Sequence, residues 1–403
     1  MINPYFIHVL SFIAVIFAYL FHWSDLYPNL SVSLILFLFF TIVIALLIGS
    51  VFVKENIITF KNTATNRIHY LKHITYAILF GYFLEFLYHG TFPLLAIFTG
   101  SSLSYHEFGI PVFHVFLVTF NSFFSIYLFQ VFLSETERNK KIAFLLLILN
   151  LIPSILIMNR GMLIIILMSL ISVYLIKYER KLTLKKLSGI AAILLIALYL
   201  FGVLGNIRVN NSYQTNTSLF DSNLFLDIGG ATDEFKESPI PKEFFWGYIY
   251  LTSPLANLQK TIDEFEHTED VGIKNSFEFA TTQLLPDFIS KRIVPVFNIN
   301  IPDAIKITPE LNVSTAFAAS YTTLGWVGIS LYMLVIFVFA YFYILILKKY
   351  NSEYFIAGVA IMNSIFLFNI FSNMFSFTGL SFQLVYPVIF TILDRLKVHF
   401  QKV

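Results

Sequence analysis

Three arginines stand apart from the other basic residues of this chain. Arg160, Arg208 and Arg292 lie in or beside polar stretches, whereas the remaining arginines belong to short connectors rich in Lys and Arg. A guanidinium group is planar and presents paired N–H donors that match phosphate oxygens. Three such groups at one level would suit a diphosphate. The alternative is that each arginine pairs with a nearby carboxylate, because residues 206–317 alone carry fifteen Asp and Glu.

Three further side chains could carry a proton. His106 and Glu107 are neighbours in a polar connector, where either could accept a proton from a hydroxyl group; the alternative is that both are solvated loop residues. Glu85 lies near the middle of an apolar stretch, with His89 one helical turn later on the same face. A carboxyl group at that depth marks a functional site or forms an interhelical hydrogen bond that fixes packing. No further ligands stand at helical spacing, so we expect no metal site there.

Two aromatic residues, Trp246 and Tyr250, could stack on the faces of sugar rings. The alternative is that they anchor their segment at the level of the lipid headgroups, where Trp and Tyr are enriched.

The elements that must position these residues are apolar helices. The chain is 57% hydrophobic and 12% charged, about half the charge of a soluble domain. Its apolar stretches have the length of about 20 residues that a helix needs to cross a bilayer. We therefore predict an all-α polytopic membrane protein with about ten transmembrane helices. The predicted spans are 4–22, 30–53, 74–97, 111–133, 142–158, 161–176, 188–205, 320–346, 354–372 and 376–393.

The stretch 142–176 is either one long helix or a hairpin. Basic residues flank both of its ends, so a single crossing would place one basic cluster outside the cell, against the positive-inside rule. We therefore predict a hairpin with Asn159, Arg160 and Gly161 at its outer tip.

Charge is distributed unevenly along the chain. Residues 206–317 hold eight Lys and Arg against fifteen Asp and Glu, whereas the connectors between the other spans are rich in Lys and Arg. Alternating spans put all of these connectors and both termini on the cytoplasmic side. We predict transmembrane helices in 1–205, a large extracytoplasmic loop with short interfacial helices in 206–317, and further transmembrane helices with a cytoplasmic tail in 318–403. The first span lacks the cationic start of a secretory signal, so we expect it to be retained.

Several function classes are excluded or unsupported. The chain has no cysteine, which excludes disulfides, thiolate catalysis and Cys-based metal sites. It has no evenly basic surface for nucleic acid, and no P-loop, dinucleotide-binding, zincin or nucleophile-elbow motif.

Six short segments between about residues 80 and 330 each resemble a segment of the same protein family. They are Leu84–Leu94, Tyr105–His114, Asn159–Gly161, Gly205–Arg208, Tyr250–Leu258 and Asn312–Gly328. In order and placement they resemble segments of bacterial oligosaccharide repeat-unit polymerases, the O-antigen or capsular polysaccharide polymerases of the Wzy type. Each motif is short, and their order is more specific than any one of them. One departure concerns Arg292, because the glycine that follows the late arginine of some members by about ten residues is missing here.

The resemblance implies a membrane glycosyltransferase with a fold similar to other lipid-dependent, multi-span transferases. Such an enzyme moves a glycan from undecaprenyl diphosphate to a sugar hydroxyl of a lipid-linked repeat unit, at the outer face of the cytoplasmic membrane and without a nucleotide-sugar cofactor. Arg160, Arg208 and then Arg292 would stabilise the departing diphosphate, and His106, Glu107 or Glu85 would be the general base. Asn159, Trp246 and Tyr250 would contact substrate.

The partners that this reading implies are the bilayer, the lipid-linked donor and acceptor, a chain-length regulator and a flippase. Two other functions stay open. A flippase or transporter for the same lipid-linked glycans would need a polar path across the membrane and related halves, and a ligase would share both the architecture and the arginines.

Overall fold

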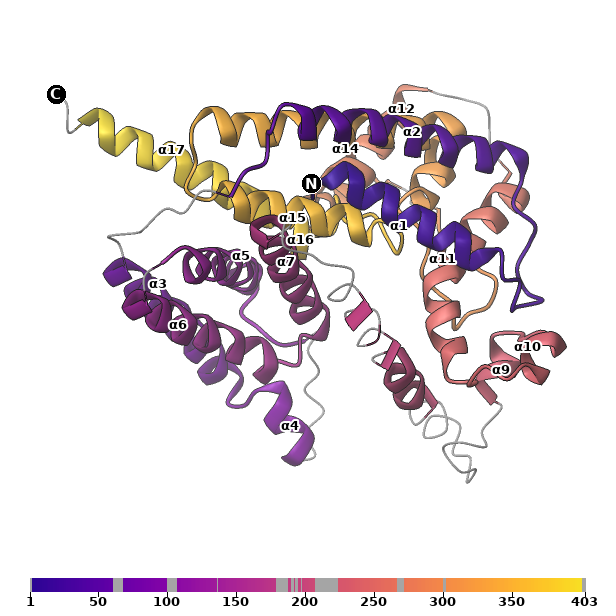
Figure 1. Cartoon of the computed structure of the whole chain (residues 1–403), viewed down its shortest axis with the longest axis horizontal. Helices are drawn as coiled ribbons and strands as arrows, with labels where there is room; N and C mark the ends of the chain where they lie inside the picture. The colour runs from indigo at the N-terminus through magenta and orange to yellow at the C-terminus, as the bar shows by residue number, and fades with distance from the viewer. Residues whose placement is uncertain are drawn as a thin grey trace.

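The computed structural model describes residues 2–60, 68–99, 107–135, 137–178, 188–189, 192, 195–196, 198–206, 224–266, 272–299 and 302–400. Within these residues the secondary structure is helical, apart from one isolated β-bridge between Ser24 and Ala231. Figure 1 shows α1, α2, α14, α15 and α17 running beside one another, with α3, α5, α6 and α7 as a second group. The two groups meet where α15 packs against α5 and α7.

Seven helical stretches in the described part of the chain are long and apolar enough to cross a bilayer. They are α2 (Val32–Lys54), α3 (Ile68–His89) with the start of α4 (Pro93–Thr99), α5 (Phe113–Ser134), α6 (Glu137–Leu156), α7 (Arg160–Tyr178), α14 (Ala318–Lys349), and α16 (Thr378–Ser381) with α17 (Val385–Phe400). Two shorter apolar helices, α1 (Pro4–Tyr19) and α15 (Phe355–Phe368), pack among them. The chain is a multi-span helical membrane protein.

Nine of the ten predicted spans coincide with these helices. The tenth, 188–205, falls partly outside the described residues, although 198–206 is helical. The number of spans and their orientation in the bilayer therefore stay predictions.

The stretch 142–176 forms two helices and not one, because α6 ends at Leu156 and α7 begins at Arg160; the outer position of the tip between them stays a prediction. Met158 between them has a positive φ of 59°, a conformation that reverses the chain and is uncommon outside glycine. The Asn159 side chain then caps α7, since its Oδ1 accepts a hydrogen bond from Met162 N at 3.0 Å.

Polar side chains link the helices inside the bundle. Asn150 Nδ2 donates to Thr75 Oγ1 at 3.0 Å and so joins α6 to α3. Asn363 Nδ2 donates to Ser172 Oγ at 2.6 Å and joins α15 to α7. Such bonds contribute about 0.6 kcal/mol each in a membrane protein, so most of the packing free energy must come from close contact of the apolar side chains.

The described part of the predicted loop, 206–317, is largely helical. It contains α9 (Leu224–Ile228), α10 (Asp233–Glu237), α11 (Phe244–Glu264), α12 (Ile273–Phe279), the π-helix η2 (Ala280–Leu284) and α13 (Asp287–Val296). Of these, α11 packs against α1 and α14. Phe235, Phe245 and Tyr248 form a second small core, against which Trp23 packs.

Helix α14 is interrupted near its beginning. Leu324 and Gly325 leave the helical conformation, and Gly325 has φ 58° and ψ −142°, a region that is essentially restricted to glycine. The chain therefore changes direction there, so that the turn 318–323 is a separate piece ahead of the long span.

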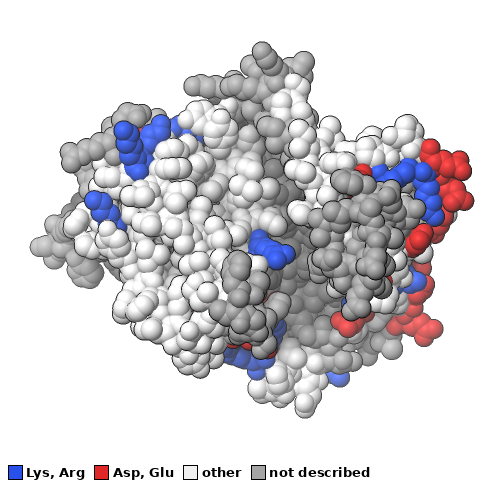
Figure 2. All heavy atoms as spheres, turned by 90° about the horizontal axis from the view of Figure 1, so that it is seen from below, with Lys and Arg blue, Asp and Glu red and all other residues white. Residues whose placement is uncertain are grey.

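The basic ends of several spans meet. Lys348 Nζ at the end of α14 donates to Asn56 O just after α2, at 3.2 Å, and a guanidinium nitrogen of Arg395 in α17 donates to Tyr350 O at 2.9 Å. Figure 2 shows most of the Asp and Glu of this face at one side of the molecule, where Lys and Arg are interspersed with them, and another group of Lys and Arg near the opposite side. The hydrogen bonds of Lys348 and Arg395 thus bring the ends of α2, α14 and α17 together.

Candidate functional site

A polar cavity of about 490 Å³ lies where the loop helices meet the ends of the spans. This volume is within the range of small-molecule sites, roughly 300–1,000 Å³. Nine of its eighteen lining residues carry a hydroxyl or amide group, and four are charged. The lining residues are Thr282, Gln283, Asp287, Ser290, Lys291, Val294, Pro302, Asp303, Ala304, Lys306, Asn312, Ser314, Thr315, Ala318, Ala319, Ser372, Asn373 and Ser376.

Asn373 fixes the part of the cavity formed by the turn after α15. Its Nδ2 donates to Gln283 O at 2.9 Å, and its Oδ1 accepts from Tyr332 Oη and Ser376 N, both at 3.0 Å. One buried amide therefore joins the turn to η2 and to α14. Asn373 is buried, so loss of these hydrogen bonds would leave polar groups unsatisfied inside the protein.

Helix α13 is attached to the same turn at its N-terminus. Asp287 N donates to Ser376 O at 2.7 Å, and Phe288 N donates to Thr378 Oγ1 at 2.7 Å. Two of the N–H groups that a helix leaves without an internal partner are satisfied in this way. The first turn of α13 is thus fixed against the start of α16.

One face of α13 lines the cavity. Asp287, Ser290, Lys291 and Val294 line it and follow the i, i+3, i+4, i+7 spacing of a single helix face. Burial raises the pKa of the Asp287 carboxyl, and the neighbouring Lys291 opposes this by lowering it. The cavity thus holds a half-buried acid one turn away from a cation.

A second acid and a second lysine, Asp303 and Lys306, also line the cavity. Asn257 of α11 holds this segment, because its Nδ2 donates to Leu311 O at 2.6 Å and its Oδ1 accepts from Ile307 N at 2.8 Å. The side chains of Lys291 and Lys306 are exposed, so both ammonium groups can reach a ligand in the cavity.

Arg292 lies on a different face of α13 from the cavity residues. Its guanidinium group stacks over the Phe288 ring at 4.0 Å and donates to Phe288 O. The Phe288 ring in turn contacts Phe116 of α5 and Phe382. The structure therefore places Arg292 beside the cavity, and Lys291 is the cation of α13 that lines it.

Arg160 and Arg292 belong to helices that both approach α16. Met162, in the first turn of α7, has its sulfur 3.6 Å from the position of a β-carbon built on Gly379. Phe288, on which Arg292 stacks, is bonded to Thr378. The exposed Arg160 therefore lies at the same end of the bundle as Arg292.

Glu85 is completely buried and engaged by two partners. Its side chain is 0% exposed, and Oε2 lies 2.9 Å from Nδ1 of His114, whose side chain is 16% exposed. Its Oε1 accepts from Ile110 N at 3.2 Å, while His89 Nε2 accepts from Gly109 N at 2.9 Å. Glu85 and His89 of α3 therefore both bind the segment that leads into α5.

The remaining predicted residues are placed as follows. Glu107 is exposed at the start of that segment, and Arg208 and His106 lie outside the described residues. Trp246 Nε1 donates to Asn206 Oδ1 at 2.7 Å, and Tyr250, 45% exposed, contacts Phe201 ring to ring at 5.0 Å. Neither aromatic residue lines the cavity.

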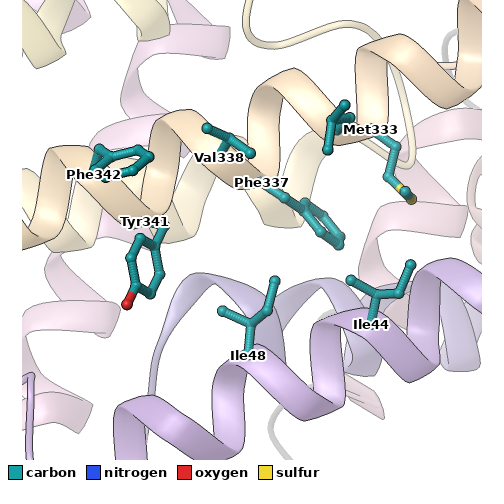
Figure 3. A pocket seen from close by; sticks show the side chains of 8 residues that line it. Ile44, Ile48, Met333, Phe337, Val338, Tyr341 and Phe342 are labelled. Carbon is teal, nitrogen blue, oxygen red and sulfur yellow. The ribbon is translucent and has the colours of Figure 1, made fainter.

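A second hollow, of about 300 Å³, lies between α2 and α14. Figure 3 shows Ile44 and Ile48 of α2 pointing toward Phe337 and Tyr341 of α14. It lies between two candidate spans, and none of the residues that line it is charged.

Sequence reasoning did not single out Asp287, Lys291, Lys306, Asn257 and Asn373. The signal for the first two was the helical spacing of polar residues in 287–294. Among the described residues no group of three or more His, Asp or Glu could hold a metal ion. Comparison of the chain with protein-family models, curated proteins and solved structures finds no match.

Proposed function

We propose that this protein is a polysaccharide polymerase. It transfers a glycan chain from undecaprenyl diphosphate to a sugar hydroxyl of a lipid-linked repeat unit, and the polar cavity is its reaction site. The observation that carries the proposal is the composition of this cavity, which combines two exposed lysines with nine hydroxyl and amide side chains at the ends of membrane spans.

The diphosphate and the sugar of the substrate need different binding groups, and the cavity contains both kinds. Lys291 and Lys306 suit the diphosphate, because an ammonium group binds phosphate as a compact charge. Hydroxyl and amide groups suit a sugar, since each can donate to or accept from its hydroxyls. Charge grows on the diphosphate as the glycosidic bond breaks, so fixed cations there stabilise the transition state more than the ground state.

Two of the segments that resemble repeat-unit polymerases contribute to this cavity, and a third lies near a helix to which α13 is bonded. Asn312, Ser314 and Thr315 of the late segment line it, and Asn257 of the middle segment holds one of its sides. The arginine hairpin at Arg160 lies near α16, to which α13 is bonded. Segments far apart in the sequence thus support one site.

The charge distribution supports the orientation. The basic ends of α2, α14 and α17 meet, and basic helix ends favour the cytoplasmic side. The cavity lies at the start of α14, the opposite end of that span from Lys348. We therefore propose that the cavity and the loop helices face outward and that both termini are cytoplasmic.

The test is a deletion of the gene, with complementation by the wild-type protein and by a Lys291→Gln, Lys306→Gln double variant. Surface polysaccharide is then read on a gel. We expect single repeat units without a ladder in the deletion, a ladder with the wild-type protein, and little or no ladder with the double variant. Lipid intermediates held on the inner face would instead indicate a flippase, and free polymer without its anchor would indicate a ligase.

A further inference from the structure

We propose that Asp287 is the general base of this reaction and takes the proton from the acceptor hydroxyl. The inference rests on the proposed function and adds the residue that moves the proton. It is carried by the position of Asp287 on the cavity side of α13, one turn from a lysine, in a backbone that is bonded at its first two residues.

The backbone position of Asp287 is defined by its surroundings. Asp287 N is bonded to Ser376 O and Phe288 N to Thr378 Oγ1, so the helix start cannot drift relative to the cavity. Side chains at i and i+4 are neighbours on a helix, with about 5–6 Å between their β-carbons. Lys291, one turn after Asp287, lines the same cavity and is close enough to lower the pKa of the Asp287 carboxyl group.

Electrostatics suit proton transfer at this position. Burial raises the pKa of Asp287, and Lys291 partly offsets that effect. The other charged groups that line the cavity are Asp303 and Lys306, while the turn to which Asp287 is bonded contributes the neutral Asn373 and Ser376. A carboxylate with a raised pKa is a stronger proton acceptor, and a base gains efficiency as its pKa approaches the operating pH.

The step is balanced in atoms and electrons. The acceptor hydroxyl oxygen forms a bond to the anomeric carbon of the donor, and the bond from that carbon to the diphosphate oxygen breaks. Its electron pair leaves with the diphosphate, near Lys291 and Lys306, and the hydroxyl proton passes to the carboxylate of Asp287. Release of that proton to water restores the site.

Other described carboxyl groups fit the role less well. Glu85 is fully buried, and its two oxygens bind His114 and Ile110. Glu107 does not line the cavity. Asp303 does line it, but it is exposed; it is therefore the rival that an experiment must separate from Asp287.

The experiment uses the full chain in lipid nanodiscs, with undecaprenyl diphosphate-linked repeat units extracted from cells that lack the gene. Polymer formation is measured between pH 5 and 9 for the wild-type protein and for Asp287→Asn, Asp287→Glu and Asp303→Asn. Asp233→Asn, on the exposed surface of α10, is the control and should match the wild-type protein. Affinity for undecaprenyl diphosphate is measured in parallel.

We expect Asp287→Asn to lower the rate at least 100-fold, the lower limit for loss of a general base, and to leave the affinity within about threefold. The rate of the wild-type protein should fall as the pH drops through the raised pKa of Asp287. This fall in rate at low pH, the acidic limb of the pH–rate profile, should persist in Asp303→Asn. It should shift to another pH in Asp287→Glu, which keeps a carboxylate at a changed position.

The outcomes separate this inference from the proposed function. If the wild-type protein makes no polymer from these lipids, the proposed function fails and the assignment of Asp287 fails with it. If the wild-type protein polymerises and Asp287→Asn does so nearly as fast, or loses affinity and not rate, Asp287 is not the base although the function stands. Should Asp287→Asn fail to fold, an unchanged acidic limb in Asp287→Glu would overturn the assignment.

Discussion

The buried pair of Glu85 and His114 gives a sharp test, because the sequence left open whether Glu85 acts in chemistry or in packing. The two side chains meet at 2.9 Å, and Ile110 N also donates to Glu85 at 3.2 Å. Removal of one partner from a buried pair costs about 3–5 kcal/mol. We therefore expect Glu85→Ala to lower the free energy of unfolding by that amount. Glu85→Gln keeps the volume and an acceptor, so it should cost about 1–3 kcal/mol.

A double-mutant cycle isolates the interaction. Glu85→Ala, His114→Ala and the double variant are unfolded by denaturant in detergent micelles, and the coupling free energy is taken from the three differences. We expect a coupling of about 1.5–3 kcal/mol, the range for a hydrogen bond that involves a charged group. Glu237→Gln, an exposed carboxyl of α10, is the control and should change stability by less than about 0.5 kcal/mol.

The result also decides the role of Glu85 in activity. If it acts in packing, Glu85→Gln should still make polymer at a temperature where the variant is folded. A coupling free energy near zero, or a Glu85 variant of normal stability that makes no polymer, would contradict a role of Glu85 in packing. In the second case Glu85 would have to act on the substrate directly.

The other predictions concern the cavity and its surroundings. Lys291→Gln and Lys306→Gln should each lower the polymerisation rate about tenfold or more, and affinity for undecaprenyl diphosphate should fall in both; unchanged affinity would remove the lysines from the diphosphate site. Gly325→Ala should cost about 1–3 kcal/mol, because its φ of 58° and ψ of −142° are strained for any other residue; a stability equal to that of the wild-type protein would refute the bend. Arg160→Ala should reduce polymer length with protein still in the membrane, and more strongly than Arg292→Ala, since Arg292 stacks on Phe288; equal, normal polymer from both would exclude a role for either.

The membrane helices could be predicted from the sequence because each one follows from a local property. An apolar run of the right length gives a span, and basic residues at both ends of 142–176 required the hairpin that Met158 makes. The role of Glu85 could be stated only as two alternatives. Its partner His114 stands far along the chain, and only the packing of α3 against α5 brings the two together.

The cavity could not be predicted, because it depends on contacts between distant segments. Lys291 and Arg292 are adjacent in the sequence, and arginine is the better phosphate ligand by geometry. Which of the two lines the cavity depends on the orientation of α13, and that is set by the bonds from Asp287 and Phe288 to the turn around Ser376. Residue type alone predicted Arg292 as the phosphate ligand, whereas the orientation of the helix places Lys291 at the cavity.

The location of the cavity follows from where the spans are interrupted. Hydrocarbon cannot satisfy backbone N–H and C=O groups, so a helix can break at membrane depth only where protein or water provides partners. Here α14 breaks at Gly325, and α15 ends before the turn that carries Asn373. Asn373 supplies partners for that turn, and Thr322 Oγ1, just ahead of the break, donates to Pro302 O at 3.1 Å. The polar groups that such breaks demand can also bind a sugar or a diphosphate. Residues near both breaks line the cavity, namely Ala318 and Ala319 ahead of the break in α14 and Ser372 and Asn373 after the end of α15.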